Sequence, residues 1–249
     1  EFQSPRRIAT ADGRRVFISD FTSSLKVFRW SEADTLVHDH NIQLDRTVGE
    51  FCVLGDTIYT VEATVDEDGG AIRAYDVDGT NLGKFGEIYR SEKPIVRQNM
   101  SEGKIACDRA TGRVVFAANR LPGIRGFDPN WGLAWVTLIG RYRAPEMVEA
   151  GRRFQYRIPE SGAHIGYTVE DVAGPGILVQ YALVPHSADR RRTRDLERFD
   201  TYVLDARSGD GAALGLDPGR LRASTPALAV TNQHLPYPRF IVWREETGS

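Results

Sequence analysis

Short runs of β-branched and aromatic residues alternate with clusters of glycine, aspartate, asparagine and proline along almost the whole chain. This pattern predicts antiparallel β-strands joined by turns, because strand side chains alternate between two faces and turn residues interrupt the apolar runs. The stretch AIRAYDVDGTNLGKFG, residues 71–86, is typical: apolar residues lead into a turn at Asp78-Gly79, and further apolar residues lead out. Helical periodicity is nearly absent, and the one short helix that we predict lies in RAPEMVEAGRRF, residues 143–154.

The same strand–loop–strand unit recurs five times along the chain. In each copy an apolar strand ends near a polar residue and is followed by a loop and a second strand with an aromatic residue. Some copies carry a further strand before or after this pair, so the unit is a four-stranded meander. The copies begin at Val16, Ile58, Val114, Ile177 and Leu228. Repeats of roughly 40–50 residues with four strands each are typical of propeller blades, and the excess here falls in loops at 141–163 and 187–199.

We therefore predict an all-β fold: a single β-propeller domain over residues 1–249, built from four-stranded antiparallel blades. A lone blade cannot bury both of its faces, whereas blades packed against neighbours can. Five blades are visible, and we expect six, with one degenerate within residues 141–163 or truncated before Glu1. Residues 141–162 have room for two strands at most, and a ring of five blades is the alternative.

The composition limits the classes of molecule that this chain is expected to bind. The chain of 249 residues is 41% hydrophobic and 27% charged, the balance of an ordinary globular protein. Its net charge of −2 offers no broad attraction for nucleic acid or an anionic membrane. No apolar run approaches the roughly 18 residues of a transmembrane segment. Because the chain starts at Glu1 without methionine, we expect a processed or trimmed chain; a removed leader or lipid anchor would suit a periplasmic or extracellular location.

Several segments resemble the six-bladed β-propeller superfamily of the NHL-like and TolB-like kind. VFISDFTSSLKVFRW, from Val16, is similar to the NHL-type pattern of a strand ending in aspartate, a small polar loop and a Val-x-Phe strand. IRAYDVDGTNLGKFG and IRGFDPNWGLAW resemble the outer hairpins of that family, and the resemblance runs from about Arg6 to Arg244. The chain departs from the family in showing five strand pairs. The resemblance implies a scaffold rather than one activity, because one fold carries many functions.

The resemblance points in two functional directions. TolB-like propellers typically serve as interaction platforms in the bacterial envelope. Sugar-lactone hydrolases of the six-bladed class hold a metal in the channel with Glu, Asn and Asp.

Four of the predicted second strands end at residues that could bind such a metal ion. These are Asp20, Glu62, Asn119 and Asn232. Propellers place such strand ends near one mouth of the channel, where a ring of oxygen ligands suits Ca²⁺. The alternative is that each side chain bonds its own turn backbone, as Asp and Asn commonly do.

The two cysteines, Cys52 and Cys107, occupy matching places on the expected innermost strands of consecutive blades. Two cysteines exclude a disulfide scaffold and a Cys-rich zinc module. They form one disulfide if the compartment is oxidising and the two Cα atoms come close enough, or they are buried small hydrophobic residues.

Two segments are candidates for contact with a partner. The loop DRRRTRDLERF, residues 189–199, could dock an acidic partner or lipid headgroups, or it is a solvated loop. Its arginines are Arg190, Arg191, Arg192, Arg194 and Arg198. Tyr237 stands between two prolines and could contact a protein, or it caps a blade.

Two functions from different classes follow. The first is a non-catalytic propeller, without a cofactor, that binds a protein as a scaffold or accessory subunit of an envelope or membrane-associated complex. No catalytic motif and no phosphate-binding loop is present in the sequence. The second is a Ca²⁺-dependent hydrolase or lyase of the sugar-lactonase type, with its site at the channel mouth.

Overall fold

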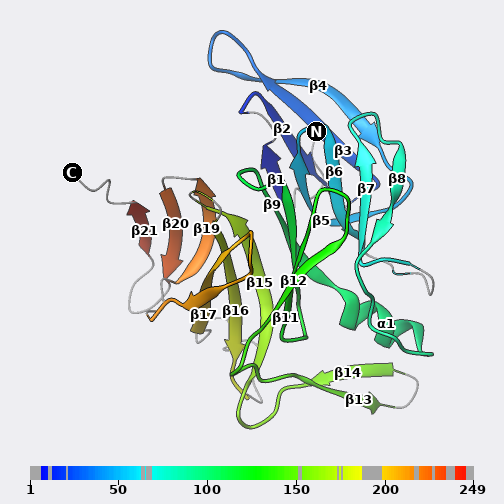
Figure 1. Cartoon of the computed structure of the whole chain (residues 1–249), viewed down its shortest axis with the longest axis vertical. Helices are drawn as coiled ribbons and strands as arrows, with labels where there is room; N and C mark the ends of the chain where they lie inside the picture. Colours follow the sequence, from blue (N-terminus) through cyan, green and yellow to red (C-terminus); the bar gives the residue numbers. More distant parts are fainter. Residues whose placement is uncertain are drawn as a thin grey trace. The chain divides into compact units, whose positions relative to one another are not determined.

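The computed structural model describes residues 7–10, 13–20, 22–62, 65, 69–150, 153–172, 174, 176–186, 198–215, 219–225, 228–233 and 239–244. The chain divides into two compact units, residues 1–107 and 108–249, and each is described by itself. Small antiparallel sheets make up both units (Figure 1).

The first unit contains two four-stranded meanders, in which each strand pairs with the next along the chain (Figure 1). The first meander consists of β1 (Arg7–Thr10), β2 (Arg15–Ser19), β3 (Ser24–Trp30) and β4 (Leu36–Gln43). The second consists of β5 (Val48–Leu54), β6 (Thr57–Glu62), β7 (Ile72–Asp76) and β8 (Asn81–Phe85). Helix α1 (Pro94–Ser101) and strand β9 (Gly103–Asp108) follow, and the boundary between the units falls at the end of β9.

Three further blade sheets follow along the chain. A third four-stranded sheet has the order β12-β11-β10-β9 and a fourth has the order β15-β16-β17-β18, while β19, β20 and β21 form a three-stranded sheet. The strands of the third sheet after β9 are β10 (Arg113–Ala118), β11 (Gly123–Phe127) and β12 (Leu133–Leu138). Those of the fourth are β15 (Ala163–Asp171), β16 (Gly176–Val184), β17 (Arg198–Asp205) and β18 (Gly211–Ala213). The last three strands are β19 (Arg220–Thr225), β20 (Leu228–Gln233) and β21 (Arg239–Arg244).

These sheets confirm the predicted all-β fold of β-propeller blades. Every strand pair recorded in these sheets is antiparallel, and five blade sheets occur among the described residues. Residues 141–163, one expected location of a sixth blade, contain the short two-stranded sheet of β13 (Glu146–Ala150) and β14 (Arg153–Arg157). Six blades remain a prediction.

The predicted helix at 143–154 is wrong, because that segment contributes to the β13–β14 hairpin. In RFQYR, residues 153–157, aromatic residues alternate with polar ones, and this period suits a strand better than a helix. The helix among the described residues is α1, which begins with a proline in its first turn, a position that proline tolerates well. At eight residues α1 is too short for helical periodicity to reveal it. No helix in the described part of the chain is long and apolar enough to cross a membrane.

Burial follows the position of each strand in its sheet. Strand β6 is buried at five consecutive positions, because an inner strand is covered on both faces. Strand β4, at the outer edge of its sheet, is exposed at seven of its eight positions. The largest side chains of the core in the first unit include Phe17, Phe51 and Tyr75.

The turn predicted at Asp78-Gly79 joins β7 to β8. The carboxylate of Asp76 accepts hydrogen bonds from the backbone N–H groups of Asp78, at 3.0 Å, and Thr80, at 2.8 Å. Gly79 has a φ of +87°, and a Cβ atom there would lie 2.4 Å from the carbonyl oxygen of Gln43. The position therefore requires glycine for its backbone conformation and for space.

Candidate functional site

Two of the predicted metal ligands lie in the first unit, and each already faces a cation. Asp20 directly follows β2 and is 5% exposed, with one carboxylate oxygen 3.6 Å from the ammonium nitrogen of Lys26. Glu62 ends β6, is also 5% exposed, and forms an ion pair with Arg73. Either carboxylate would have to give up part of this pairing to bind a metal ion.

The other two predicted ligands lie in the second unit. Asn119 directly follows β10, and its side-chain Oδ1 is buried without a hydrogen-bond partner in the described structure. Asn232 pairs through β20 with Arg220 and Phe240, and its side chain lies outside the described residues. The described residues contain no group of three or more His, Cys, Asp or Glu side chains that could hold a metal ion. Convergence of all four residues on one ion therefore stays a prediction.

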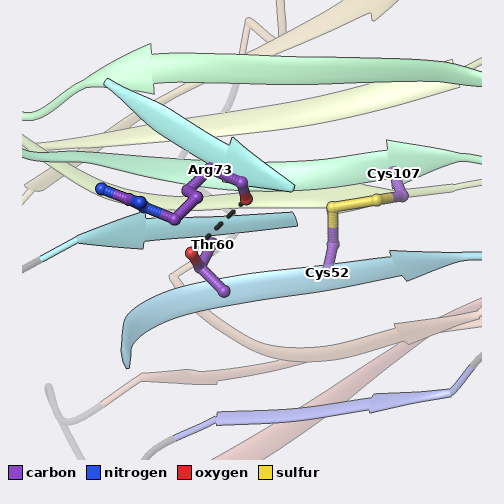
Figure 2. The surroundings of a disulfide bond; sticks show 4 residues. All are labelled: Cys52, Thr60, Arg73 and Cys107. Atoms are coloured by element: carbon purple, nitrogen blue, oxygen red, sulfur yellow. Dashed lines mark hydrogen bonds between the residues drawn. A yellow bond between two sulfur atoms is a disulfide. The ribbon is translucent and has the colours of Figure 1, made fainter. Parts of the chain in front are cut away.

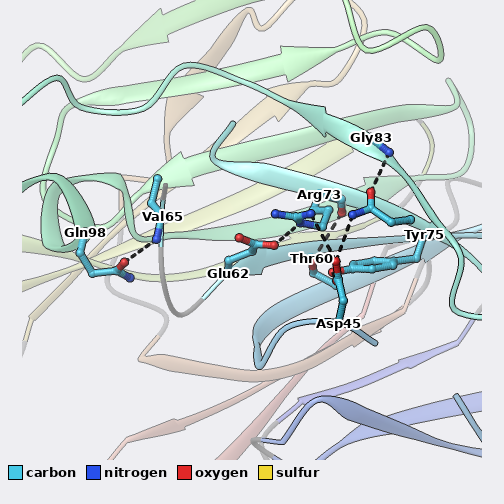
Figure 3. Close-up of polar contacts among 9 residues, drawn as sticks. Asp45, Thr60, Glu62, Val65, Arg73, Tyr75, Gly83 and Gln98 are labelled. Carbon is cyan, nitrogen blue, oxygen red and sulfur yellow. Dashed lines mark hydrogen bonds and ion pairs between the residues drawn. The ribbon is translucent and has the colours of Figure 1, made fainter. Parts of the chain in front are cut away.

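Glu62 belongs to a polar network that crosses the second sheet (Figure 3). Arg73 on β7 bonds Glu62 on one side, and its Nη1 lies 3.6 Å from a carboxylate oxygen of Asp45 on the other. Asp45 also accepts hydrogen bonds from the hydroxyl of Tyr75, at 2.5 Å, and from the side-chain amide of Asn81, at 3.2 Å. The network thus runs from the buried Glu62 to the more exposed Asp45.

The charge states of Asp45 and Tyr75 follow from their contacts within this network. Burial opposes the charged form of Asp45, but the hydrogen bonds from Tyr75 and Asn81 and the charge of Arg73 outweigh it and lower the pKa of Asp45. Burial, with a further contribution from Asp45, raises the pKa of Tyr75. The carboxylate of Asp45 is therefore charged and the phenol of Tyr75 is neutral around neutral pH. Each carboxylate is held by donors, which suits a positioning role better than proton transfer.

A disulfide joins Cys52 on β5 to Cys107 on β9, with 5.6 Å between the two Cα atoms (Figure 2). Both residues are buried, at 6% exposed. Figure 2 also shows Thr60 and Arg73 of the neighbouring strands, where the hydroxyl of Thr60 donates to the carbonyl of Arg73 at 3.5 Å. The structure therefore contains the disulfide rather than two separate buried thiols, and it links the second sheet to β9.

A buried histidine in the second unit was not singled out by sequence reasoning. His164 on β15 is 2% exposed; its Nε2 lies 2.9 Å from a carboxylate oxygen of Asp200, and its Nδ1 accepts the backbone N–H of Arg143 at 2.8 Å. Because Nδ1 is an acceptor, Nε2 carries the proton that is donated to Asp200. Both ring nitrogens are occupied, so this pair cannot act as a general base without breaking a bond. Nothing in the local sequence distinguishes His164 from a surface histidine.

The first unit has a cavity of about 510 Å³ beside α1, and its size is within the range of small-molecule sites. It is lined by Ile88, Arg90, Ser91, Glu92 and Arg97. Arg97 is 7% exposed and donates to the carbonyl of Ser91 at 3.0 Å. The lining mixes two guanidinium groups with one carboxylate, so it does not select one charge class of ligand.

The β3–β4 hairpin carries a mixed aromatic and apolar outer face, which we define as the half-buried Phe28 and the exposed Trp30, Leu36 and His38. Trp30 pairs with Leu36 across the two strands, and Phe28 pairs with His38, so the four side chains lie on one face of the hairpin. The rings of Phe28 and His38 meet edge to face, with centroids 5.4 Å apart. Trp30 is 52% exposed and Leu36 is 36% exposed.

The predicted partner-binding residues lie almost wholly outside the described residues. This holds for Arg190, Arg191, Arg192, Arg194 and Tyr237. Arg198 is described: it begins β17, its side chain is 72% exposed, and its Nε lies 3.7 Å from a carboxylate oxygen of Asp200. The role of the arginine loop therefore stays a prediction.

The antiparallel blade sheets define this chain as a β-propeller protein. Comparison with known proteins agrees at the level of the fold. No protein-family model and no curated protein matches the chain. Among solved structures, a member of the DUF4221 family from Bacteroides vulgatus is similar over 94% of this chain and 76% of its own, with a TM-score of 0.57 and 8% identity. The dihydro-heme d1 dehydrogenase NirN is matched over 98% of this chain and 46% of its own, with a TM-score of 0.47 and 12% identity. At 8% identity the likeness to the DUF4221 protein shows the fold alone.

Proposed function

We propose that this protein is a non-catalytic β-propeller that serves as a protein-interaction scaffold or accessory subunit of a larger complex. The observation that carries the proposal is the outer face of the β3–β4 hairpin, on which Trp30 and Leu36 lie exposed at the end nearest the turn. Tryptophan is enriched among the residues that dominate protein interfaces, and exposed apolar clusters mark interaction sites. The net charge of −2 favours a protein partner over nucleic acid.

The internal polar groups support the same proposal. Asp20 and Glu62 face Lys26 and Arg73, and both ring nitrogens of His164 are hydrogen-bonded. An acid or base that catalyses proton transfer must be able to reach a substrate. We infer that the groups named here have structural roles and that the surface carries the proposed function.

We also propose an oxidising compartment, periplasmic or extracellular, for this scaffold. The support is the disulfide between Cys52 and Cys107, since disulfides persist in oxidising compartments and are rare where thiols are kept reduced. An envelope complex would fit both this compartment and the interaction role.

Purification of the tagged protein from its native source, after cross-linking in mild detergent, tests the scaffold role. Truncation of a central interface tryptophan costs about 2 kcal/mol or more, so we expect Trp30→Ala to reduce recovery of a stoichiometric partner by at least about tenfold. The matched control is Leu82→Ala, which removes another exposed apolar side chain of the same unit, 46% exposed on β8.

Equal recovery of the partner by Trp30→Ala and Leu82→Ala would contradict the proposed surface. Absence of any stoichiometric partner would contradict the scaffold role itself. The alternative, a Ca²⁺-dependent hydrolase, would then gain support from calorimetric Ca²⁺ binding that Asn119→Ala abolishes.

A further inference from the structure

Helix α1 in the first unit buries polar rather than apolar side chains. Of its eight residues, the two that are buried are Arg97 and Ser101, whereas Ile95 is 49% exposed. Arg97 and Ser101 are four residues apart, so they lie on the same face of the helix. Arginine is rarely buried unless its charge is matched, because removal of the charge from water is costly. Arg97 is also the residue through which α1 lines the cavity of about 510 Å³.

The other residues that line this cavity belong to the segment of residues 88–92, which precedes the helix. Two hydrogen bonds fix this segment against α1. The backbone N–H of Tyr89 donates to Oγ of Ser101 at 2.9 Å, and Nη1 of Arg97 donates to the carbonyl of Ser91 at 3.0 Å. The two polar residues that α1 buries therefore hold the opposite wall of the cavity in place.

Two further hydrogen bonds restrain the helix and the chain that enters it. Oε1 of Gln98 on α1 accepts the backbone N–H of Val65 at 2.6 Å (Figure 3). Oγ of Ser91 accepts the backbone N–H of Lys93 at 3.2 Å, directly before the helix begins. The cavity is therefore formed before any ligand binds, which lowers the entropic cost of binding.

Three of the side chains that line the cavity are charged: Arg90, Arg97 and Glu92. The two guanidinium groups match a carboxylate, which arginine binds through charge-assisted hydrogen bonds. The carboxylate of Glu92 matches an ammonium group instead, and it repels a second negative charge on a ligand. Ile88 adds an apolar side chain to the lining. A ligand that carries one carboxylate, one ammonium group and an apolar part matches all four side chains.

We propose that this cavity binds a free α-amino acid with an apolar side chain. The carboxylate of the amino acid faces Arg90 and Arg97, its ammonium group faces Glu92, and its side chain packs on Ile88. A volume of about 510 Å³ lies within the range of small-molecule sites. The site lies wholly within residues 1–107 and does not depend on the proposed scaffold function.

Isothermal titration calorimetry of the full chain with L-leucine tests the proposal. Two analogues provide the comparison: 4-methylpentanoate lacks the ammonium group, and 3-methylbutylamine lacks the carboxylate. We expect saturable binding of L-leucine and at least about tenfold weaker binding of each analogue, because each analogue loses the hydrogen bonds of one charged group.

Two results of this titration would overturn the proposal. The first is the absence of saturable L-leucine binding at millimolar concentrations. The second is equal affinity for L-leucine and 4-methylpentanoate, which would indicate a site for simple carboxylates in which Glu92 plays no part.

Substitution of the two exposed charged residues, Arg90 and Glu92, assigns the binding to this cavity while leaving the buried Arg97 in place. We expect Arg90→Met to weaken L-leucine binding by at least about tenfold. Glu92→Gln should remove most of the preference for L-leucine over 4-methylpentanoate, because it removes the charge that pairs with the ammonium group. The matched controls are Lys93→Met and Glu87→Gln, which remove exposed charges of the same sign outside the set of residues that line the cavity. Equal L-leucine affinity in all four variants would place the binding elsewhere and contradict the proposed site.

Discussion

At the scale of single residues, the pair of Arg73 and Glu62 combines opposite charges at low exposure, 9% and 5%. Removal of ions from water is costly, and the cost is offset only while each charge keeps its partner. Arg73 is supported further by Asp45, which Tyr75 and Asn81 hold in place. The pair therefore depends on both members, and the loss of one should cost more than the loss of both.

We predict that Arg73→Met lowers the free energy of unfolding by about 3–5 kcal/mol, because Glu62 is left buried without its cation. The double variant Glu62→Gln/Arg73→Met should lose less than the sum of the two single variants. Urea denaturation followed by tryptophan fluorescence measures all three. Arg29→Met is the control, since Arg29 pairs with Asp39 while 61% exposed and should change stability little. Strict additivity of the two single variants would rule out the coupling.

At the scale of elements, Trp135 of β12 attaches the third sheet to the fourth within the second unit. Its indole N–H donates to the carbonyl of Ala206 at 2.8 Å, and the hydroxyl of Thr137 donates to the carbonyl of Gly209 at 2.6 Å. Two side chains of β12 thus donate hydrogen bonds to the turn between β17 and β18. Gly209 has a φ of +75°, and a Cβ atom there would lie 2.5 Å from the ring of Trp135.

We predict that Gly209→Ala destabilises the protein by about 2–4 kcal/mol, since it combines left-handed backbone strain with overpacking against Trp135. Gly140→Ala is the control: a Cβ atom there meets nothing within 4 Å, and the change should stay within about 0.5 kcal/mol. Chemical denaturation of both variants gives the comparison. Equal stability of the two variants would show that the turn does not depend on this contact.

At the scale of the whole molecule, the disulfide is the one covalent link between strands that are distant in sequence. Cys52 and Cys107 are 55 residues apart, and the bond restricts the unfolded chain over that length. The entropy of closing a loop of this size corresponds to about 4 kcal/mol at 25 °C. The bond therefore contributes substantially to the stability of a chain of 249 residues.

We predict that reduction of this disulfide lowers the free energy of unfolding by about 4 kcal/mol, with an equal loss in Cys52→Ser/Cys107→Ser. Urea denaturation with and without a thiol-free reductant measures the effect. The double variant should be insensitive to the reductant, which controls for effects on other groups. An unchanged wild-type midpoint under full reduction, verified by thiol titration, would exclude a stabilising role.

The sequence by itself determined the blades, because strand alternation and turn chemistry are local properties. The turn at Asp78-Gly79 is an example: one aspartate bonds two backbone N–H groups within four residues, and glycine allows the required φ. The five repeated hairpins likewise appear as five blade sheets among the described residues. The predicted helix at 143–154 was wrong. A short apolar segment with charged residues is compatible with a helix, but the pairing of β13 with β14 makes it part of a hairpin.

Only the tertiary structure decided the partners of the candidate functional residues. The strand ends at Asp20 and Glu62 were visible in the sequence, but Lys26 and Arg73 became their neighbours through pairing of adjacent strands. The contact of His164 with Asp200 likewise joins residues that lie far apart along the chain. Charge, burial and hydrogen bonding at such a position depend on which strands pack together. This packing depends on the whole fold. Strands and turns, in contrast, depend on residues that are close together in the sequence.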